Sequence, residues 1–327
     1  MINDPDTGSL KPFDFNKIMK QIPEIKTLGY HIESYSFNPP VDSSEVQPAI
    51  WSRMAEIIEE NYLKFDGFVV LHGTDTMAYS ASALSFMLEN LAKPVIFTGS
   101  QIPIGALRTD GKENLITSIV IAAAKESAKA VVPEVCVYFE SQLSRGNRTT
   151  KFSAEQFNAF QSANYPYLAN AGVHIIYHRE AVRYPGKFRE LLVHKQFNNH
   201  IAILKLFPGM TPEYVDAILG YKELKGLILE TYGAGNAPTD FWFLDRIKKA
   251  VDRGVIILNV TQCSRGSVEM GRYETSRHLL NAGVISGYDI TTEAATTKMM
   301  ILLAQDLNME QVKMLLNKSL KGEITVP

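Results

Sequence analysis

The sequence predicts an α/β protein with two domains. Short apolar runs, typical of buried strands, alternate along the chain with segments of helical periodicity, and this alternation is the pattern of parallel strands joined by helices. The length of 327 residues suits two domains of ordinary size. The alternation is interrupted at 183–202, where Tyr184-Pro185-Gly186 and Asn198-Asn199-His200 break the pattern. We therefore expect an N-terminal domain at 1–182, a linker at 183–202 and a C-terminal domain at 203–327.

The strongest local signal in the first domain is a strand, a polar turn and a helix at residues 68–88. The apolar run Phe68–Leu71 is followed by Thr74-Asp75-Thr76 and then by small and apolar residues at helical spacing. The other elements expected here are a helix from Asp14 towards Leu28, a strand at 31–37, a helix at 47–63, a strand at 94–98, a helix at 112–127, a strand at 131–139 and a tight turn at 145–148 between two short strands.

The second domain repeats the alternation of strand and helix. We expect strands at 201–207, 226–231 and 255–260, a helix start at Thr211-Pro212, a helix from Asp240 to about Arg253, and helices near 273–281, 291–306 and 309–319. These elements predict a larger N-terminal domain with a doubly wound, mostly parallel sheet. They predict a smaller C-terminal domain with a flavodoxin-like parallel sheet.

Composition argues against several classes of protein. The net charge is −2 and the isoelectric point is near 6.4, which favours neither nucleic acid nor an anionic membrane as a partner. The two cysteines, Cys136 and Cys263, have no metal-binding spacing and fit a reducing compartment. No apolar run reaches about 18 residues, and the polar N-terminus does not resemble a signal peptide. We expect a cytoplasmic protein.

Polar side chains gather where the predicted strands end, which is where open parallel sheets place their ligands. They are Thr74-Asp75-Thr76, Ser100-Gln101, Asn236 and Thr261-Gln262. A hydroxyl beside a carboxylate, with a lysine nearby, can form an activated nucleophile. From pattern alone, however, helix capping is the favoured interpretation of Thr74 and Asp75. By the same reasoning, Lys151 is a solvated surface residue.

Two further features have ordinary structural interpretations. His72 ends a predicted strand, and it is interpreted as a satisfied side chain rather than a base, although the sequence names no partner for it. The segment Gly233-Ala234-Gly235 lacks the third glycine of a dinucleotide-binding loop, so we expect a tight backbone turn there and no NAD.

Five blocks, in order along both domains, resemble the cytoplasmic (type I) bacterial L-asparaginases. The blocks are Asp66–Tyr79, with its His-Gly-Thr-Asp-Thr core, Pro94–Pro103, Arg145–Lys151, Tyr232–Pro238 and Thr261–Cys263. The resemblance implies hydrolysis of L-asparagine to L-aspartate and ammonia, without a metal or cofactor. It also implies a catalytic site made of two threonines, an aspartate and a lysine. Thr74, Asp75 and Lys151 match the second catalytic group of that site.

The resemblance also implies how the substrate is held. Asp42 and Ser43 match the loop that binds the α-amino and α-carboxylate groups, and Ser100 and Gln101 are further expected substrate contacts. Asn236 is similar to a position that reaches the site of a neighbouring subunit, so a homo-oligomer, a dimer or a tetramer, is expected. A free amino acid carries both charges, so its pocket needs a carboxylate as well as hydroxyl or backbone donors.

The chain departs from the family pattern at its beginning. Family members open with a buried strand ending in Thr-Gly-Gly-Thr-Ile-Gly, and the second threonine is usually assigned as the nucleophile. Neither feature precedes the segment that follows Met1, and Ser9 lies where some members have a tyrosine. The simplest interpretation is a start codon assigned too late or a shortened chain. We expect the 327-residue chain to be inactive or nearly so, and poorly soluble, because a missing interior strand exposes ladder edges.

Other functions remain open from the sequence. A catalytically dead homologue could bind an amino acid as a sensor, and a related amidotransferase subunit releases ammonia from glutamine for tRNA-linked chemistry. The preference for asparagine or glutamine stays open. So does an allosteric response at a second site near Glu230 and Cys263, which some type I enzymes have.

Overall fold

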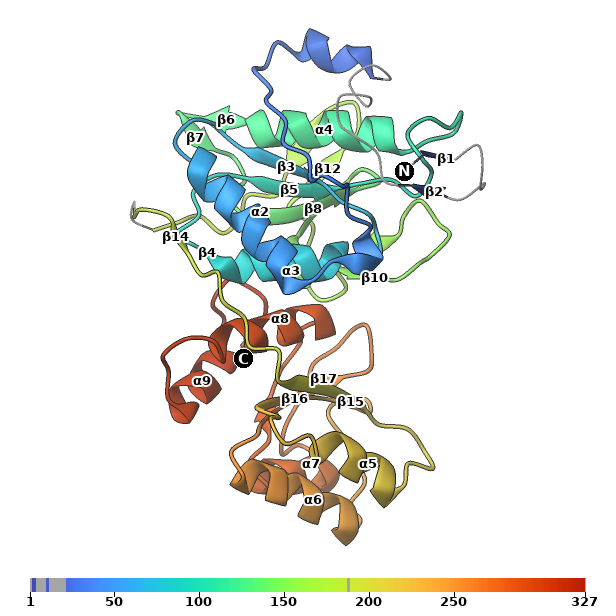
Figure 1. Ribbon diagram of the computed structural model, residues 1–327, viewed down its shortest axis with the longest axis vertical. Helices are drawn as coiled ribbons and strands as arrows, with labels where there is room; N and C mark the ends of the chain where they lie inside the picture. Colours follow the sequence, from blue (N-terminus) through green and yellow to red (C-terminus); the bar gives the residue numbers. More distant parts are fainter. Residues whose placement is uncertain (1, 4–9, 12–21, 187–188, 327) are drawn as a thin grey trace. The chain divides into compact units, whose positions relative to one another are not determined.

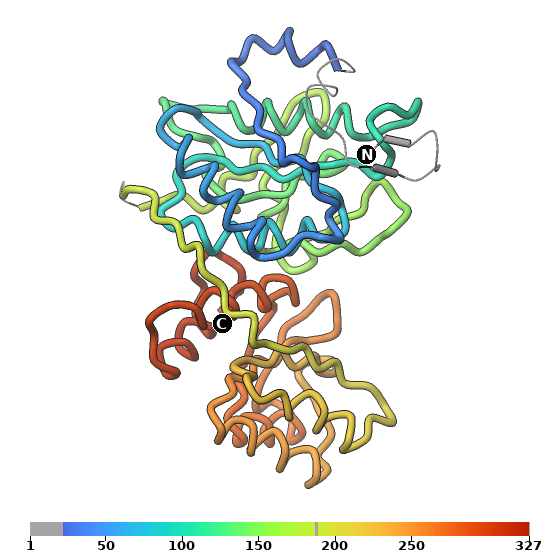
Figure 2. Tube along the Cα trace, viewed as in Figure 1, coloured from blue at the N-terminus to red at the C-terminus, as the bar shows by residue number. Residues whose placement is uncertain are grey.

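The computed structural model describes residues 2–3, 10–11, 22–186 and 189–326 (Figures 1 and 2). The chain divides into two compact units, Met1–Lys195 and Gln196–Pro327. The helix expected from Asp14 lies largely outside the described residues, as does Ser9, and its described end is a 3-10 turn, η1 (Pro23–Leu28). Two short strands, β1 (Ile2–Asn3) and β2 (Leu10–Lys11), pair antiparallel near the N-terminus.

The first unit is built on a six-stranded sheet in the order β13-β12-β9-β8-β5-β3. Its strands are β3 (Phe68–Leu71), β5 (Val95–Thr98), β8 (Val135–Phe139), β9 (Gln142–Arg145), β12 (Ala169–Ala171) and β13 (Ile175–Tyr177). β3, β5 and β8 pair in parallel, whereas the β8, β9, β12 and β13 neighbours pair antiparallel. Four strands therefore run in one direction, as expected for a mostly parallel sheet.

Helices cover both faces of this sheet, which confirms the doubly wound architecture (Figure 1). α4 (Gly111–Ala123) lies on one face, and α2 (Pro48–Asn61) and α3 (Met77–Met87) lie on the other. Nearly every residue of α3 is buried, because small alanines and serines let the helix pack tightly on several sides. Short antiparallel pairs outside this sheet include β4 (Leu88–Glu89) with β14 (Leu192–Val193) and β6 (Lys125–Glu126) with β7 (Lys129–Ala130).

One expected element of the first unit is wrong, and a second is right only in part. Residues 31–37 are irregular, because their weak alternation leaves most side chains exposed and no described strand pairs with them. The tight turn expected at 145–148 between two short strands is present as a buried 3-10 turn, η3 (Gly146–Arg148), which packs against α3, but the strands that flank it do not pair with each other as a hairpin. β9 therefore pairs with β8, while β10 (Thr150–Lys151) pairs with β11 (Phe160–Gln161). This pairing places Lys151 in a short strand of its own.

The second unit contains a four-stranded sheet in which all neighbouring strands are parallel. Its strands are β15 (Ile201–Lys205), β16 (Gly226–Thr231), β17 (Ile256–Thr261) and β18 (Ile285–Ser286). Its helices are α5 (Pro212–Leu219), α6 (Phe241–Asp252), α7 (Glu274–Asn281), α8 (Thr292–Leu302) and α9 (Met309–Leu316). The buried residues of β16 and β17 form an apolar core with α5, α6 and α7. The expected parallel sheet is confirmed.

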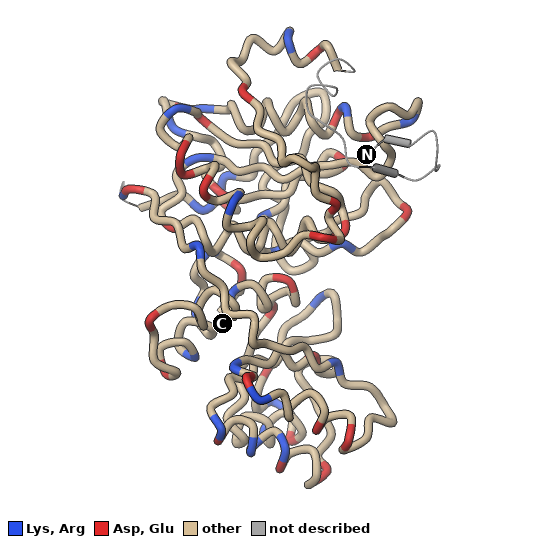
Figure 3. The backbone as a smooth tube through the Cα atoms, viewed as in Figure 1, with Lys and Arg blue, Asp and Glu red and all other residues tan. Residues whose placement is uncertain are grey.

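Charged residues of both signs are interspersed along the backbone of each unit (Figure 3). This distribution agrees with the small net charge of the sequence. Within the described part of the chain, no helix combines the length and the hydropathy needed to cross a membrane.

Candidate active site

The turn after β3 brings together the residues on which the site depends. The amide of His72 donates to the carbonyl of Thr98 over 2.9 Å, which extends the pairing of β3 with β5 into the turn. This approach requires Gly99, because a Cβ there would lie 2.3 Å from the His72 carbonyl oxygen. Helix α3 then starts after Thr76, and neither Thr74 nor Asp75 occupies the N-cap position. Helix capping is therefore the wrong interpretation of these two residues.

Lys151 connects the hydroxyl and the carboxylate of this turn. Its ammonium donates to Thr74 Oγ1 over 2.9 Å and to Asp75 Oδ1 over 2.8 Å. The Lys151 side chain is only 18% exposed, so it is not the solvated lysine that pattern alone favours. The hydrogen bond from Lys151 is the main cause that holds the pKa of Asp75 below its ordinary value, which keeps the carboxylate ionised at neutral pH.

Ser43 approaches the same turn from the loop that precedes α2. Its hydroxyl donates to Asp75 Oδ2 over 3.4 Å, and its carbonyl accepts from Thr76 Oγ1 over 2.6 Å. Gly73 makes this contact possible, because a Cβ there would lie 2.5 Å from Ser43 Oγ. Asp42, one residue earlier, caps the short 3-10 turn η2 (Ser43–Glu45) by accepting from the amide and hydroxyl of Ser44.

Gln101, which follows the end of β5, is held by contacts of its own. The Asp110 carboxylate accepts from the amide of Gln101 over 3.0 Å and from that of Ile102 over 3.1 Å. The side chain of Gln101 donates to the carbonyl of Gln156, away from Thr74, Asp75 and Lys151. The sequence did not single out Asp110 as a supporting residue; its place directly before the first residue of α4 was the available signal.

His72 has the partners that the sequence could not name. Its Nδ1 lies 2.6 Å from the Gly73 carbonyl oxygen, and its Nε2 lies 2.9 Å from Ser80 Oγ. Ser80 also accepts from Trp51 Nε1 over 2.8 Å. Burial lowers the pKa of His72, and the backbone contact and Asp75 oppose that shift without reversing it. The ring is therefore neutral near pH 7.

This lowered pKa predicts that stability depends on pH. The ordinary histidine pKa is 6.5 and that of folded His72 is lower, so the unfolded chain takes up the proton first as the pH falls. The free energy of unfolding should decrease below about pH 6.5. Urea unfolding of the wild type and of His72→Asn at several pH values measures this. The pH-dependent decrease should be smaller in the variant, and identical slopes would contradict the prediction.

Asn236 lies in the second unit, in the turn after β16. Its side-chain oxygen accepts from Thr275 Oγ1 over 2.7 Å, and its backbone forms a bridge with Tyr232. Gly233 and Gly235 have φ of 49° and 102°, values that favour glycine, so this segment turns tightly as expected. Cys263 is exposed after β17.

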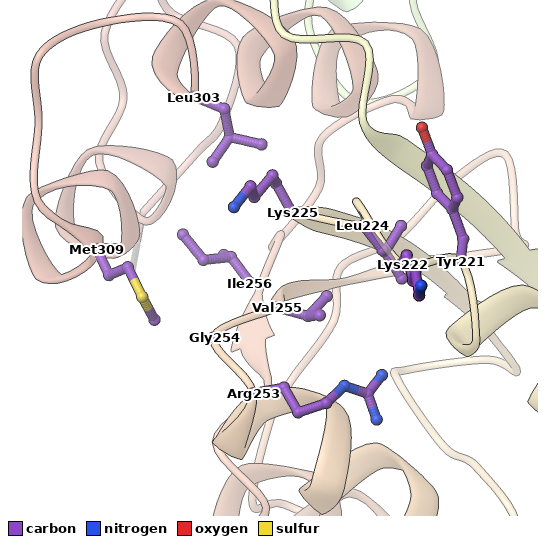
Figure 4. A pocket seen from close by; sticks show the side chains of 10 residues that line it. All are labelled: Tyr221, Lys222, Leu224, Lys225, Arg253, Gly254, Val255, Ile256, Leu303 and Met309. Carbon is purple, nitrogen blue, oxygen red and sulfur yellow. The ribbon is translucent and has the colours of Figure 1, made fainter.

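A cavity of about 310 Å³ in the second unit lies at the amino-terminal ends of β16 and β17, whereas Asn236 and Cys263 follow the carboxyl-terminal ends of these strands (Figure 4). It is lined by Lys225, which precedes β16, and by the first residues of β17, and none of the expected site residues faces it. Its Arg253 follows α6 and donates to the carbonyl of Leu219, the last residue of α5. Cations at helix C-termini are ordinary electrostatic partners of the terminal carbonyls. The guanidinium of Arg253 therefore has a local structural partner.

The chemistry of the first-unit site follows from its contacts. A hydroxyl bonded to a lysine, which is bonded in turn to an ionised carboxylate, can pass a proton between a nucleophile and a leaving group. Such an arrangement is suited to nucleophilic attack on a carbonyl carbon. The chain matches the model of the N-terminal asparaginase domain over residues 1–183 and that of the glutaminase/asparaginase C-terminal domain over 200–316. The protein belongs to the asparaginase/glutaminase family and is an amidohydrolase.

Known relatives support this assignment. L-asparaginase 1 of Escherichia coli is 45% identical over 291 residues, covering 89% of this chain and 84% of that protein. A glutamyl-tRNA(Gln) amidotransferase subunit of Pyrococcus abyssi is 32% identical over 98% of this chain and 73% of its own length. The crystal structure of L-asparaginase I from Vibrio cholerae superposes with a TM-score of 0.87 at 42% identity, covering 95% of this chain and 92% of that one.

Proposed function

We propose that this protein hydrolyses L-asparagine to L-aspartate and ammonia. The observation that carries the proposal is the double contact of Lys151, whose ammonium donates to both Thr74 Oγ1 and Asp75 Oδ1. The proposal is supported by the 45% identity to a protein named L-asparaginase 1. Asparagine offers an amide carbon to a hydroxyl nucleophile, and the ammonia that leaves needs a proton, which a lysine relay supplies.

The charges of the site suit a free amino acid as the substrate. The ionised Asp75 carboxylate is the counter-charge that an α-ammonium group requires, and the mostly buried Ser43 hydroxyl beside it is a donor for an α-carboxylate. We assign Asp42 to the same loop-based recognition, with Ser100 and Gln101 as further contacts. Substrate binding would then compete with the present contacts of Asp42 to Ser44.

We further propose that hydrolysis needs a second threonine, the nucleophile, carried by a strand beside β3. Within the described residues, β3 is the last strand of its sheet and has no strand on its outer side. Its four apolar residues are only half-buried, although helices cover both faces of the sheet. An apolar edge without charges or proline accepts another strand readily. On this proposal the 327-residue chain alone is inactive or nearly so, and is poorly soluble.

Ammonia release tests both proposals. The chain as given and a form extended by an N-terminal strand ending in Thr-Gly-Gly-Thr-Ile-Gly should be compared on L-asparagine, L-glutamine and D-asparagine. We expect hydrolysis of L-asparagine only by the extended form, and more soluble protein from it. Equal rates in the two forms would contradict the role of the second threonine, and no release from any amide by either form would contradict an amidohydrolase function for this site.

The assembly and the location of the protein are also proposals. We propose a cytoplasmic dimer or tetramer in which Asn236 of one subunit completes the site of another, supported by the similarity to type I enzymes. The turn that carries Asn236 is held by Thr275 and Tyr232, so its position can be reproduced in each copy. Sedimentation of the extended form would show a single monomeric species if this proposal were wrong.

A second candidate is ammonia supply for tRNA-linked chemistry. It is favoured by the 32% identity to an amidotransferase subunit over nearly the whole chain. The same substrate panel separates the two functions, since a preference for L-glutamine would favour the amidotransferase role. Binding of L-aspartate without turnover of any amide would favour a sensor.

A further inference from the structure

Three hydrogen-bonded side chains connect helix α2 to the backbone directly before Thr74. The indole Nε1 of Trp51 donates to Ser80 Oγ over 2.8 Å, and Ser80 Oγ lies 2.9 Å from Nε2 of His72. Nδ1 of His72 lies 2.6 Å from the carbonyl oxygen of Gly73. None of the three side chains belongs to the group to which we assign the chemistry. Their function is therefore not explained by the proposed reaction itself.

The Trp51 indole and the Gly73 carbonyl, at the two ends of this series of hydrogen bonds, determine which atoms carry the protons. An indole N–H can only donate and a backbone carbonyl can only accept. Ser80 therefore accepts from Trp51 and has its own O–H left to donate to Nε2 of His72. Nδ1 of His72 must then carry a proton in order to donate to Gly73. The connection is complete only with a neutral ring protonated at Nδ1. Trp51 is 6% exposed and Ser80 is fully buried, so water hardly competes for these bonds.

The backbone of Gly73 needs contacts from other residues to stay in one conformation. It cannot carry a side chain, because a Cβ would lie 2.5 Å from Ser43 Oγ. A glycine backbone is also the most free to rotate. The two residues that follow, Thr74 and Asp75, both contact Lys151, so rotation of the Gly73 peptide would move two partners of the lysine together. The His72 ring restrains that rotation through the Gly73 carbonyl.

We propose that His72, held in one tautomer by Ser80 and Trp51, is a positioning residue for the Thr74 and Asp75 pair. This inference rests on the proposed function of that pair in amide hydrolysis. His72 takes no proton from the substrate in this scheme. It fixes the direction of the Gly73 carbonyl, and with it the distance between Thr74 and Lys151.

The first test needs no catalytic activity. Nitrogen-15 NMR of histidine-labelled full-length protein reports the tautomer of each ring, and the His72 signal is assigned by its loss in His72→Gln. We expect the ring of His72 to be protonated at Nδ1 and to remain neutral at pH values where an ordinary histidine, with a pKa of about 6.5, is charged. Ser80→Ala should give a mixture of tautomers and shift the amide signals of Thr74 and Asp75. Protonation at Nε2 in the wild type would overturn the proposal.

The second test uses two replacements that differ in which ring nitrogen they imitate. The amide nitrogen of His72→Asn lies near the position of Nδ1 and can still donate to Gly73, whereas that of His72→Gln reaches towards Nε2. In the form that hydrolyses asparagine, we expect kcat to fall about 10²-fold in His72→Gln and about tenfold or less in His72→Asn, with KM nearly unchanged. Equal losses in the two variants would overturn the proposal.

A double-variant comparison separates positioning from general stability. If Ser80 acts through His72, Ser80→Ala should lower kcat in the wild type but have no further effect in His72→Asn. Losses that multiply would show that Ser80 acts independently and would overturn the proposed connection.

If no form releases ammonia, the proposed function fails. In that case the NMR result decides the positioning proposal by itself: amide shifts of Thr74 and Asp75 in Ser80→Ala support it, and unchanged signals overturn it.

Discussion

Replacing Lys151 with methionine should lower the kcat for L-asparagine by about 10³- to 10⁴-fold. Methionine has a similar length but no ammonium, so Thr74 and Asp75 lose the donor that they share. The hydroxyl then has no proton relay. Because the Lys151 hydrogen bond is the main cause of the low pKa of Asp75, that pKa should also rise towards its ordinary value. Steady-state ammonia release by the strand-extended form measures the effect.

The controls for this variant distinguish loss of chemistry from loss of structure. Thr74→Val should reduce kcat similarly, because it keeps the side-chain shape and removes the hydroxyl. Lys129→Met removes an exposed lysine from the β6–β7 hairpin, and it should leave the rate unchanged. If Lys151→Met kept a rate within about threefold of wild type, a loss of well under 1 kcal/mol in transition-state stabilisation, Lys151 would not belong to the catalytic group.

Replacing Lys298 with methionine should destabilise the second unit by about 3–5 kcal/mol. Lys298 and Glu323 are both fully buried and their charged groups lie 2.6 Å apart. The three ammonium protons have three acceptors, since Nζ also donates to the carbonyls of Leu316 and Lys318 over 2.9 and 2.7 Å. Burial alone raises the pKa of Glu323, but Lys298 and backbone donors hold it below its ordinary value. Without the lysine, a buried carboxylate loses its counter-charge.

Urea unfolding followed by Trp242 fluorescence measures this loss. The second tryptophan of the sequence, Trp51, lies in the first unit, so a Trp51→Phe background makes the signal specific to the second unit. Adding Glu323→Gln to Lys298→Met should recover part of the stability, because no unpaired charge remains. Lys313→Met breaks an exposed pair with Glu310 on α9 and should cost less than about 1 kcal/mol. Equal effects of the buried and exposed lysines would contradict the prediction.

The elements that the sequence predicted well have strong local signals. The strand at Phe68–Leu71 and the helix that follows it come from an apolar run and a spacing of small residues. The start of α5 comes from Thr211 and Pro212, and Thr211 does cap that helix. The strand at 31–37 was predicted wrongly, and the strands on either side of the turn at 145–148 pair with other partners. Weak alternation and a glycine-asparagine turn signal do not reveal which segments lie beside them.

The sequence by itself determined the α/β class, a mostly parallel sheet in the first unit and a parallel sheet in the second. Through five ordered motifs, it also determined the family and the expected catalytic residues. Only the tertiary structure decided how those residues meet. Lys151 lies 76 positions from Asp75, and the contact depends on a short strand that replaced the expected hairpin. The contacts of Ser43, Asp110 and His72 likewise join separate elements. Periodicity and turn residues encode local conformation, whereas contacts between distant segments depend on how the elements pack.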